Sequence, residues 1–265
     1  MTKRWMMVMA VAAVAMAQPQ PKQPQPKSEK ELQAVMTVQN AADPDARVKA
    51  AAELLAKFKD TDFKEWALQM QTLSYQQKND FDNMIITGEL TLEVNPDNVV
   101  VLITLAQSIP QRVREHDLDK DEKLGAAEKH AKKAMALIPN LTKFNPQITD
   151  EEWSGYKRGA MSQVHEALGM VAYTRKDWPS SESAFKAAVD VSPQPDPTTM
   201  YRFAMVYAAQ DKIDPAISLL NQAIAAGGVK IGDKDLAAEK KAELEKAKAA
   251  AKPAAPPPQV EIKRQ

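Results

Sequence analysis

The chain of 265 residues contains no cysteine, which excludes a disulfide framework, a thiol nucleophile and a lipid-modified N-terminal cysteine. Glycine is scarce, with eight residues, and aromatic residues make up only 6% of the chain. Val, Ile and Thr form no long alternating runs, and we assign the one β-rich segment, Val99 to Leu105, to a helix that begins after Asp97. A chain that is 44% hydrophobic but poor in aromatic residues suits an alanine-rich helical protein better than a sheet sandwich. The composition therefore predicts an all-α protein stabilised by helix packing.

An excess of charge of either sign is also missing, because 35 Lys and Arg balance 35 Asp and Glu. Nucleic-acid-binding proteins and proteins of anionic membrane surfaces carry basic patches that attract phosphate groups. Removal of the first 17 residues would take away Lys3 and Arg4, leaving 33 basic against 35 acidic residues and a net charge near −2. We therefore expect neither a nucleic acid nor an anionic membrane as partner.

Catalytic motifs are absent as well. The three histidines, His116, His130 and His165, form no HExxH motif and no i, i+4 pair, so we expect surface or packing roles rather than zinc ligation. The sequence has no glycine-rich phosphate loop and no G-x-S-x-G motif. These absences favour binding over catalysis, and we expect no enzyme activity, no cofactor and no metal.

One acidic segment resembles part of a calcium-binding loop. Asp117, Asp119, Asp121 and Glu128 have the spacing of four acidic ligands in a helix-loop-helix calcium site. The sharp turn of such a loop needs glycine directly after the third acid, where this chain has Glu122. The alternative interpretation, which we prefer, is a solvated loop with capping acids.

The N-terminus has the pattern of a secretory signal peptide. Lys3 and Arg4 precede an apolar stretch, Trp5 to Val14, and the small-x-small sequence Ala15-Met16-Ala17 follows. The apolar stretch is shorter than the roughly 20 residues of a membrane-spanning helix. We therefore expect residues 1–17 to be a signal peptide cleaved before Gln18, the alternative being an uncleaved anchor. The mature chain would be periplasmic or secreted and not stably inserted in a membrane.

The segment from Gln163 to Ala225 contains an internal repeat with an interval of 35 residues. The interval aligns small residues with small ones and large apolar residues with large apolar ones: Gly169 with Ala204, Phe185 with Leu220, and Ala188 with Ala223. A small residue on one helix lets a second helix approach, and a bulky residue on the second helix fills the space. The repeat therefore predicts one helix pair made twice.

This repeat resembles the tetratricopeptide repeat (TPR) family. The residues that carry the resemblance are Leu168-Gly169, Tyr173, Ser181, Phe185, Ala188 and Pro193 in one copy, and Phe203-Ala204, Tyr207, Ala216, Leu220 and Ala223 in the next. Ser181 stands where the family usually has alanine, and Gly228 replaces the closing proline of the second copy. The resemblance implies a right-handed solenoid of antiparallel helix pairs. The alternative is an ordinary helical bundle with a chance repeat.

Two degenerate copies precede the clear ones. Their buried positions are expected at Met84, Gly88 and Thr91, closed by Pro96, and at Ala127, Ala131 and Ala134, closed by Pro139. Compared with the clear copies, nine residues are inserted before the helix that contains Ala127, and a longer insertion follows Pro139. We expect a repeat domain over residues 28–251, preceded by a Pro/Gln-rich linker, 18–27, that acts as a passive tether, and followed by a disordered Pro-rich tail, 252–265.

Several residues mark expected helix ends. Ser28 with Glu31, and Thr149 with Glu152, have the spacing of capping boxes. Asp177 and Asp214 stand ahead of prolines, as N-caps do. We also expect Asp60-Thr61-Asp62 to cap a helix over 63–77, and Gly227-Gly228 to precede a terminal helix over 233–251.

The resemblance implies that the first helix of each pair lines a concave face. The positions carried over to this chain are Glu166, Met170 and Tyr173, and then Tyr201, Met205 and Ala208. Methionine and tyrosine can hold an extended peptide or a partner helix, although Met170 and Met205 can equally be core residues. We therefore expect a non-catalytic scaffold of the bacterial cell envelope that binds a protein or peptide. The alternatives are an envelope enzyme or metal- or ligand-binding protein that uses the insertions near 117–120 and 141–148, and a purely structural spacer.

Overall fold

The computed structural model describes residues 24–192 and 194–251. The predicted signal peptide, residues 18–23 of the linker, the closing Pro193 and the tail 252–265 lie outside the described residues. The elements, in chain order, are α1 (Glu29–Gln39), α2 (Pro44–Lys57), α3 (Lys64–Gln77), α4 (Phe81–Val94), α5 (Val99–Ser108), α6 (Lys120–Leu137), the 3-10 turn η1 (Ile138–Asn140), α7 (Asp150–Thr174), α8 (Trp178–Val191), α9 (Pro197–Ala209), α10 (Ile213–Ala225), β1 (Lys230–Ile231), β2 (Lys234–Asp235) and α11 (Leu236–Ala251).

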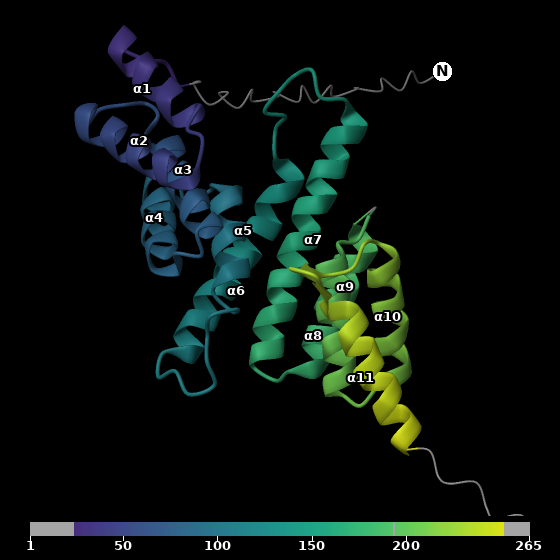
Figure 1. Ribbon diagram of the computed structural model, residues 1–265. Coiled ribbons are helices and arrows are strands. Elements are labelled where there is room, and N and C mark those ends of the chain that lie inside the picture. The colour runs from purple at the N-terminus through teal and green to yellow at the C-terminus, as the bar shows by residue number, and fades with distance from the viewer. Residues whose placement is uncertain (1–23, 193, 252–265) are drawn as a thin grey trace, which may run out of the picture.

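The helices form antiparallel pairs that stack in chain order from α1 at one end to α11 at the other (Figure 1). Each α-helix packs against the next one in the chain, and the first helices of successive pairs also meet, α3 with α5 and α5 with α7. The prediction of an all-α helical-repeat solenoid is confirmed. Within the described residues, no helix combines the length and the apolar character needed to cross a membrane.

The two clear repeats have the predicted interior. Phe185 and Leu220 are fully buried in the same hydrophobic cluster, and Ala204 is 1% exposed. A Cβ placed on Gly169 would lie 2.7 Å from Cδ2 of Phe185, so only glycine lets α7 and α8 approach this closely. Ser181, the departure from the family pattern, is buried and donates a hydrogen bond of 2.9 Å to the carbonyl of Gly169.

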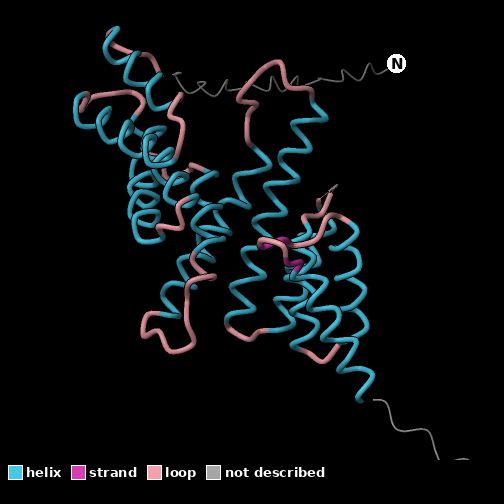
Figure 2. Tube along the Cα trace, in the orientation of Figure 1, coloured by secondary structure: helices cyan, strands magenta, loops and turns pink. Residues whose placement is uncertain are grey.

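The degenerate copies are buried at the predicted positions too. Met84, Gly88 and Thr91 lie on the buried side of α4. Ala127, Ala131 and Ala134 do so on α6. The two insertions form long loops, residues 109–119 and 141–149, at opposite ends of the stacked helices (Figure 2).

Most predicted caps are present. The hydroxyl of Ser28 accepts from the N–H of Glu31, Asp177 accepts from the N–H of Ser180, and Thr149 with Glu152 forms a capping box. Two cap predictions are wrong. Helix α10 begins one residue before Asp214, which lies in the first turn, because Pro215 needs no N–H partner anywhere in that turn.

The second wrong cap is the segment 60–62. Helix α3 begins at Lys64 with Phe63 as N-cap and without a side-chain cap. Thr61 is used elsewhere: its hydroxyl donates a hydrogen bond of 2.6 Å to Glu31, which is 2% exposed, and accepts from the N–H of Phe63. A buried carboxylate on α1 therefore determines how the chain enters α3.

The end of the domain differs from the prediction. Gly227 and Gly228 have positive φ, as a helix stop requires, but the terminal helix begins at Leu236 and not at Asp233. The two-residue strands β1 and β2 intervene. Asp235 accepts hydrogen bonds of 3.0 Å from the N–H groups of Val229 and Ala237, and pairs with Lys230. These contacts close the hairpin and lower the pKa of Asp235 to about 2, the Lys230 bond being the largest cause.

Candidate functional site

A hollow of about 450 Å³ lies between the first helices of three successive pairs, α3, α5 and α7. The residues that line it are Leu73, Gln76, Val100, Ile103, Thr104, Gln107, Tyr156, Gly159, Ala160 and Gln163. None of these side chains is charged. A Cβ on Gly159 would meet nothing within 4 Å, so α7 leaves open space here. We call this space the first-helix hollow.

The polar groups of the first-helix hollow are carboxamides. Gln76, Gln107 and Gln163 come from α3, α5 and α7, one from each helix. Within the described part of the chain, none of the three side-chain amides bonds to another protein group. Gln76 and Gln163 are exposed to solvent and Gln107 is half-buried, so all three can be reached by a ligand. A carboxamide donates through its nitrogen and accepts through its oxygen, as a peptide group does. Three such groups can form hydrogen bonds with the backbone of an extended, uncharged peptide. The apolar side chains of that peptide would then contact Val100 and Ile103.

The site residues implied by the family resemblance lie on α7 and α9. Glu166 is only 7% exposed, accepts a hydrogen bond of 2.7 Å from Thr199 and forms an ion pair with Arg202. Its carboxylate is therefore engaged within the protein, and it joins α7 to α9.

The other five predicted residues are partly buried. Met170, Tyr173, Tyr201 and Ala208 pack against the cluster around Phe185, and Met205 is also half-buried. Their exposed portions leave some surface for a partner, so their role in binding stays a prediction.

The predicted residues and the first-helix hollow lie on a continuous surface. Gln163 and Glu166 are three residues apart on α7 and are thus neighbours on the helix surface. Arg202 on α9 also donates to the side-chain oxygen of Gln111, which follows α5, at 3.2 Å. Side-chain contacts therefore connect the first helices α3, α5 and α7 to α9.

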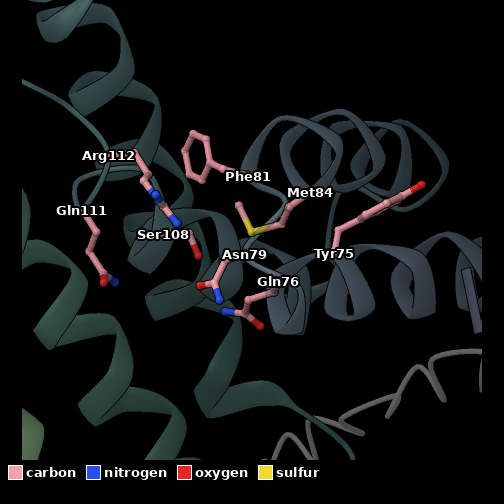
Figure 3. A pocket seen from close by; sticks show the side chains of 8 residues that line it. All are labelled: Tyr75, Gln76, Asn79, Phe81, Met84, Ser108, Gln111 and Arg112. Atoms are coloured by element: carbon pink, nitrogen blue, oxygen red, sulfur yellow. The ribbon is translucent and has the colours of Figure 1, made fainter. Parts of the chain in front are cut away.

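A smaller hollow of about 150 Å³ lies beside the end of α3 and is lined by Tyr75, Gln76, Phe81 and Met84 and, after α5, by Gln111 and Arg112 (Figure 3). The guanidinium of Arg112 lies 5.8 Å from the centre of the Phe81 ring. Gln76 also lines the first-helix hollow. This second hollow is too small for a peptide segment, and we assign it to the packing of the loop.

One pattern in the sequence was missed. Glu65 on α3 accepts hydrogen bonds of 2.7 Å from the side chains of Asn95 and Asn98, and Asn98 is the N-cap of α5. Glu166 on α7 bonds to Thr199 at the start of α9. The separation is 33 residues from Glu65 to Asn98 and from Glu166 to Thr199. The repeat thus has a second sequence pattern. A glutamate in the first helix of one pair is followed 33 residues later by a polar residue where the first helix of the next pair begins.

The first insertion does not assemble its acids into a metal site. The side chain of Asp117 accepts from the N–H of Arg114 at 2.9 Å, Asp119 pairs with Lys123, and Glu128 lies within α6 and pairs with Arg175 at 2.6 Å. The described residues contain no group of three or more histidine or acidic side chains that could hold a metal ion. In the same loop, Lys176 and Lys120 lower the pKa of Glu115 to about 2.

The histidines lie apart. The ring of His130 contacts a carboxylate oxygen of Glu89 at 3.1 Å and lowers the pKa of Glu89. His165 faces a hollow of about 580 Å³ between α6, α7 and α8, where burial lowers its pKa. His116 is exposed in the first insertion.

An aromatic cluster joins the second insertion, through Phe144, to the first turns of α7. Trp153 and Tyr156 stack with their ring centres 5.0 Å apart, and Phe144 meets both rings edge-on. Trp153 is buried, whereas Phe144 is 69% and Tyr156 42% exposed. Tyr156 also lines the first-helix hollow, and its contact with Phe144 places an aromatic rim, shared by α7 and the insertion, beside that hollow.

The arrangement is similar to that of solved TPR proteins. A thermophilic TPR protein from Thermus thermophilus matches 83% of this chain over 97% of its own length, with 14% identity and a TM-score of 0.52. MamA from Desulfovibrio magneticus, residues 41 to the end, matches 75% of this chain over 96% of its own length, with 11% identity and a TM-score of 0.54. A scan of protein-family models and a search of curated proteins found no match. The structural likeness shows a TPR-like fold.

Proposed function

We propose that this protein is a non-catalytic scaffold of the bacterial cell envelope that binds an extended, uncharged segment of a partner protein. The observation that carries the proposal is the first-helix hollow, where carboxamides from three successive first helices lie unpaired beside apolar side chains. The N-terminal sequence, with its basic start, apolar stretch and Ala15-Met16-Ala17, supports export.

The charges beside the hollow support an uncharged ligand. Glu166 is paired with Arg202, so the nearest buried carboxylate is already neutralised. An ion pair contributes to affinity and association rate in a salt-dependent way, whereas carboxamide hydrogen bonds and apolar contacts depend little on salt. We expect partner binding that changes little between low and physiological ionic strength.

The ligand would follow the row of first helices. Gln76, Gln107 and Gln163 provide bonds along its backbone, Tyr156 offers an apolar ring with a polar tip, and Tyr201 with Met205 on α9 would extend the contact. This proposal retains the predicted groove residues on the exposed parts of α7 and α9 and adds the hollow on α3 and α5.

Binding can be tested with the chain as bait in an envelope extract from the producing bacterium. We expect the retained partner to bind about tenfold more weakly to the double variant Gln107→Ala with Gln163→Ala, because two hydrogen bonds worth about 0.5 to 1.5 kcal/mol each are lost. The matched control is Gln33→Ala with Gln222→Ala, two exposed glutamines on α1 and α10. Equal affinity for the double variant, the control and the unchanged chain would contradict binding in the hollow.

The proposed envelope location is tested by cell fractionation followed by mass determination. We expect to find the protein in the envelope fraction with Gln18 as its first residue. Recovery of a chain that still carries residues 1–17 in the cytoplasm would contradict the envelope assignment.

A further inference from the structure

The packing of the first helices sets the spacing of the three carboxamides in the first-helix hollow. Gln76, Gln107 and Gln163 stand on α3, α5 and α7, and α5 meets both of the other helices. The axes of packed helices lie about 8 to 10 Å apart. A ligand that crosses the first helices therefore meets one carboxamide about every 8 to 10 Å.

This spacing distinguishes between two extended conformations of a bound segment. In a β-strand, groups on the same side repeat with every second residue, at about 7 Å. In a polyproline II helix they repeat with every third residue, at about 9 Å. Only the polyproline II repeat matches the distance between neighbouring first helices. One backbone carbonyl in each turn of such a segment can then accept a hydrogen bond from one carboxamide after another.

The hydrogen-bonding chemistry of the hollow also fits a segment that contains proline. Proline has no backbone N–H, and a polyproline II helix has no internal hydrogen bonds, so a proline-rich segment presents mainly free carbonyl acceptors. Each glutamine side chain offers two N–H donors. None of the side chains that line the hollow is charged, so an uncharged, acceptor-rich segment is the complementary ligand.

One face of α7 leaves room for the pyrrolidine rings of such a segment. Tyr156, Gly159, Ala160 and Gln163 all line the hollow and are spaced so that they share this face. The two middle residues are small, and a Cβ on Gly159 would meet nothing within 4 Å. A depression thus lies between the ring of Tyr156 and the carboxamide of Gln163.

Two exposed aromatic rings stand beside this depression. Tyr156 stacks on the buried Trp153 with ring centres 5.0 Å apart, which fixes the plane of a ring that is still 42% exposed. Phe144 of the second insertion is 69% exposed, and its ring centre lies 5.8 Å from that of Tyr156, with an angle of 73° between the planes. The two rings therefore form an open corner. Grooves lined by aromatic rings are the sites that bind proline-rich segments in the polyproline II conformation.

We propose that the first-helix hollow binds a proline-rich partner segment in the polyproline II conformation. One carbonyl per turn accepts from Gln76, Gln107 and Gln163, and a proline ring lies in the corner between Tyr156 and Phe144. This inference rests on the proposed function, because it specifies the segment that the same hollow binds. It also gives the second insertion a role in recognition.

The test uses the full chain and three uncharged peptides of equal length, each acetylated and amidated. They contain four repeats of Pro-Gln-Ala, four repeats of Gly-Gln-Ala, and six repeats of Thr-Gln. We expect the proline peptide to bind about tenfold more tightly than the other two, because it is already in the conformation that the carboxamides require and loses less entropy on binding. Isothermal titration calorimetry measures the three affinities.

Variants of the aromatic corner show whether the proline ring lies there. Phe144→Ala should weaken binding of the proline peptide about fivefold, because it removes one of the two rings. Tyr156→Phe should keep the affinity, because the ring remains. The matched control is Leu118→Ala, which removes the fully exposed apolar side chain of the first insertion and should change nothing. Phe144 and Leu118 are exposed, so neither alanine variant leaves a cavity in the core.

The outcomes separate this inference from the proposed function. If the three peptides bind equally and all lose affinity in Gln107→Ala with Gln163→Ala, the hollow binds extended segments without selecting proline; the inference is then overturned and the proposed function stands. A proline peptide that binds Phe144→Ala as tightly as the unchanged chain overturns the inference as well. So does the absence of binding by any peptide, whereas the proposed function is then decided by the partner retained from the envelope extract.

Discussion

The helix pair α7–α8 and the pair α3–α4 have the same fold but different interiors. Between α7 and α8, Gly169 receives the fully buried ring of Phe185. Between α3 and α4, the contact is polar: the hydroxyls of Thr72 and Thr87 lie 3.1 Å apart, and each also donates to a backbone carbonyl of its own helix. One pair is held by shape complementarity, whereas the other brings together two small hydroxyl side chains, each of which is satisfied by a carbonyl of its own helix.

The difference shows which features of the repeat are needed for its geometry. Both pairs keep a small residue at a close approach, Gly169 in one and Gly88 in the other. The bulky partner of Gly88, however, is Leu105 on the following pair and not a residue of its own pair. Close approach is thus common to both regions, whereas the residue that fills the space is exchangeable.

The largest expected difference in stability between the two pairs follows from removing the ring of Phe185. Phe185→Ala should lower the free energy of unfolding by about 3 to 5 kcal/mol, because a fully buried ring leaves a cavity. Thr87→Val in the polar pair should cost only about 1 kcal/mol, because Thr72 keeps its bond to the carbonyl of Leu68. Urea unfolding followed by circular dichroism measures both. Equal losses would show that the two interiors contribute alike.

Replacing Gly169 or Gly88 by alanine has two opposing effects on stability, a gain in helix propensity and a steric cost. Alanine favours a helix over glycine by about 1 kcal/mol, so both substitutions gain that amount. In Gly169→Ala the new Cβ lies 2.7 to 3.0 Å from three ring atoms of Phe185, a rigid group without free space, and overpacking should outweigh the gain by about 1 to 2 kcal/mol.

In Gly88→Ala the nearest atom is a terminal methyl group of Leu105 at 2.8 Å, which can rotate away, so we expect a change near zero. The same urea titration distinguishes the two. If Gly169→Ala proves as stable as Gly88→Ala, the ring of Phe185 is free to move and the approach of α7 to α8 is not limited by it.

Sequence periodicity was sufficient for the parts of the fold that repeat. The 35-residue interval identified Gly169, Phe185 and Leu220 as buried, and the resemblance to the TPR family that these residues carry implied the solenoid. Asp214 and the start of the terminal helix were predicted wrongly, because a proline tolerates several first-turn positions and a hairpin of two-residue strands leaves no periodic pattern.

The first-helix hollow was beyond sequence reasoning for another reason. Its residues come from three helices that belong to three different pairs, and the insertions between the pairs change the sequence separation. Gln76, Gln107 and Gln163 are therefore not equally spaced. Tyr156 was placed only in the extension at the front of α7, because nothing in the sequence fixes how far that extension reaches over α5.

A smaller effect is expected at the glutamates that link successive pairs. Glu166→Gln should lower stability by about 1 to 2 kcal/mol, since it weakens a charge-assisted bond to Arg202 in a site that is 7% exposed. Glu65→Gln should cost less, about 0.5 to 1 kcal/mol, because Glu65 bonds to the neutral amides of Asn95 and Asn98 and a glutamine oxygen still accepts. Thermal unfolding of the two variants measures the order, and a larger loss for Glu65→Gln would contradict it.

The smallest expected effect is the acid sensitivity of two loops, one in each half of the molecule. The pKa of Glu115 before α6 and that of Asp235 before α11 are both lowered to about 2, mainly by lysine hydrogen bonds. A carboxyl with a lower pKa in the folded state stabilises that state above its unfolded pKa, near 4, and the contribution disappears as the pH falls from about 4 to 2. Amide hydrogen exchange at Val229, which bonds to Asp235, should therefore accelerate over this range relative to the α10 core.

Asp235→Asn should make that exchange fast already at neutral pH and remove its dependence on acid, whereas Glu115→Gln, the matched change in the other loop, should leave Val229 unaffected. A Val229 amide that remains protected in Asp235→Asn would show that Gly227 and Gly228, and not the carboxylate, hold the hairpin closed.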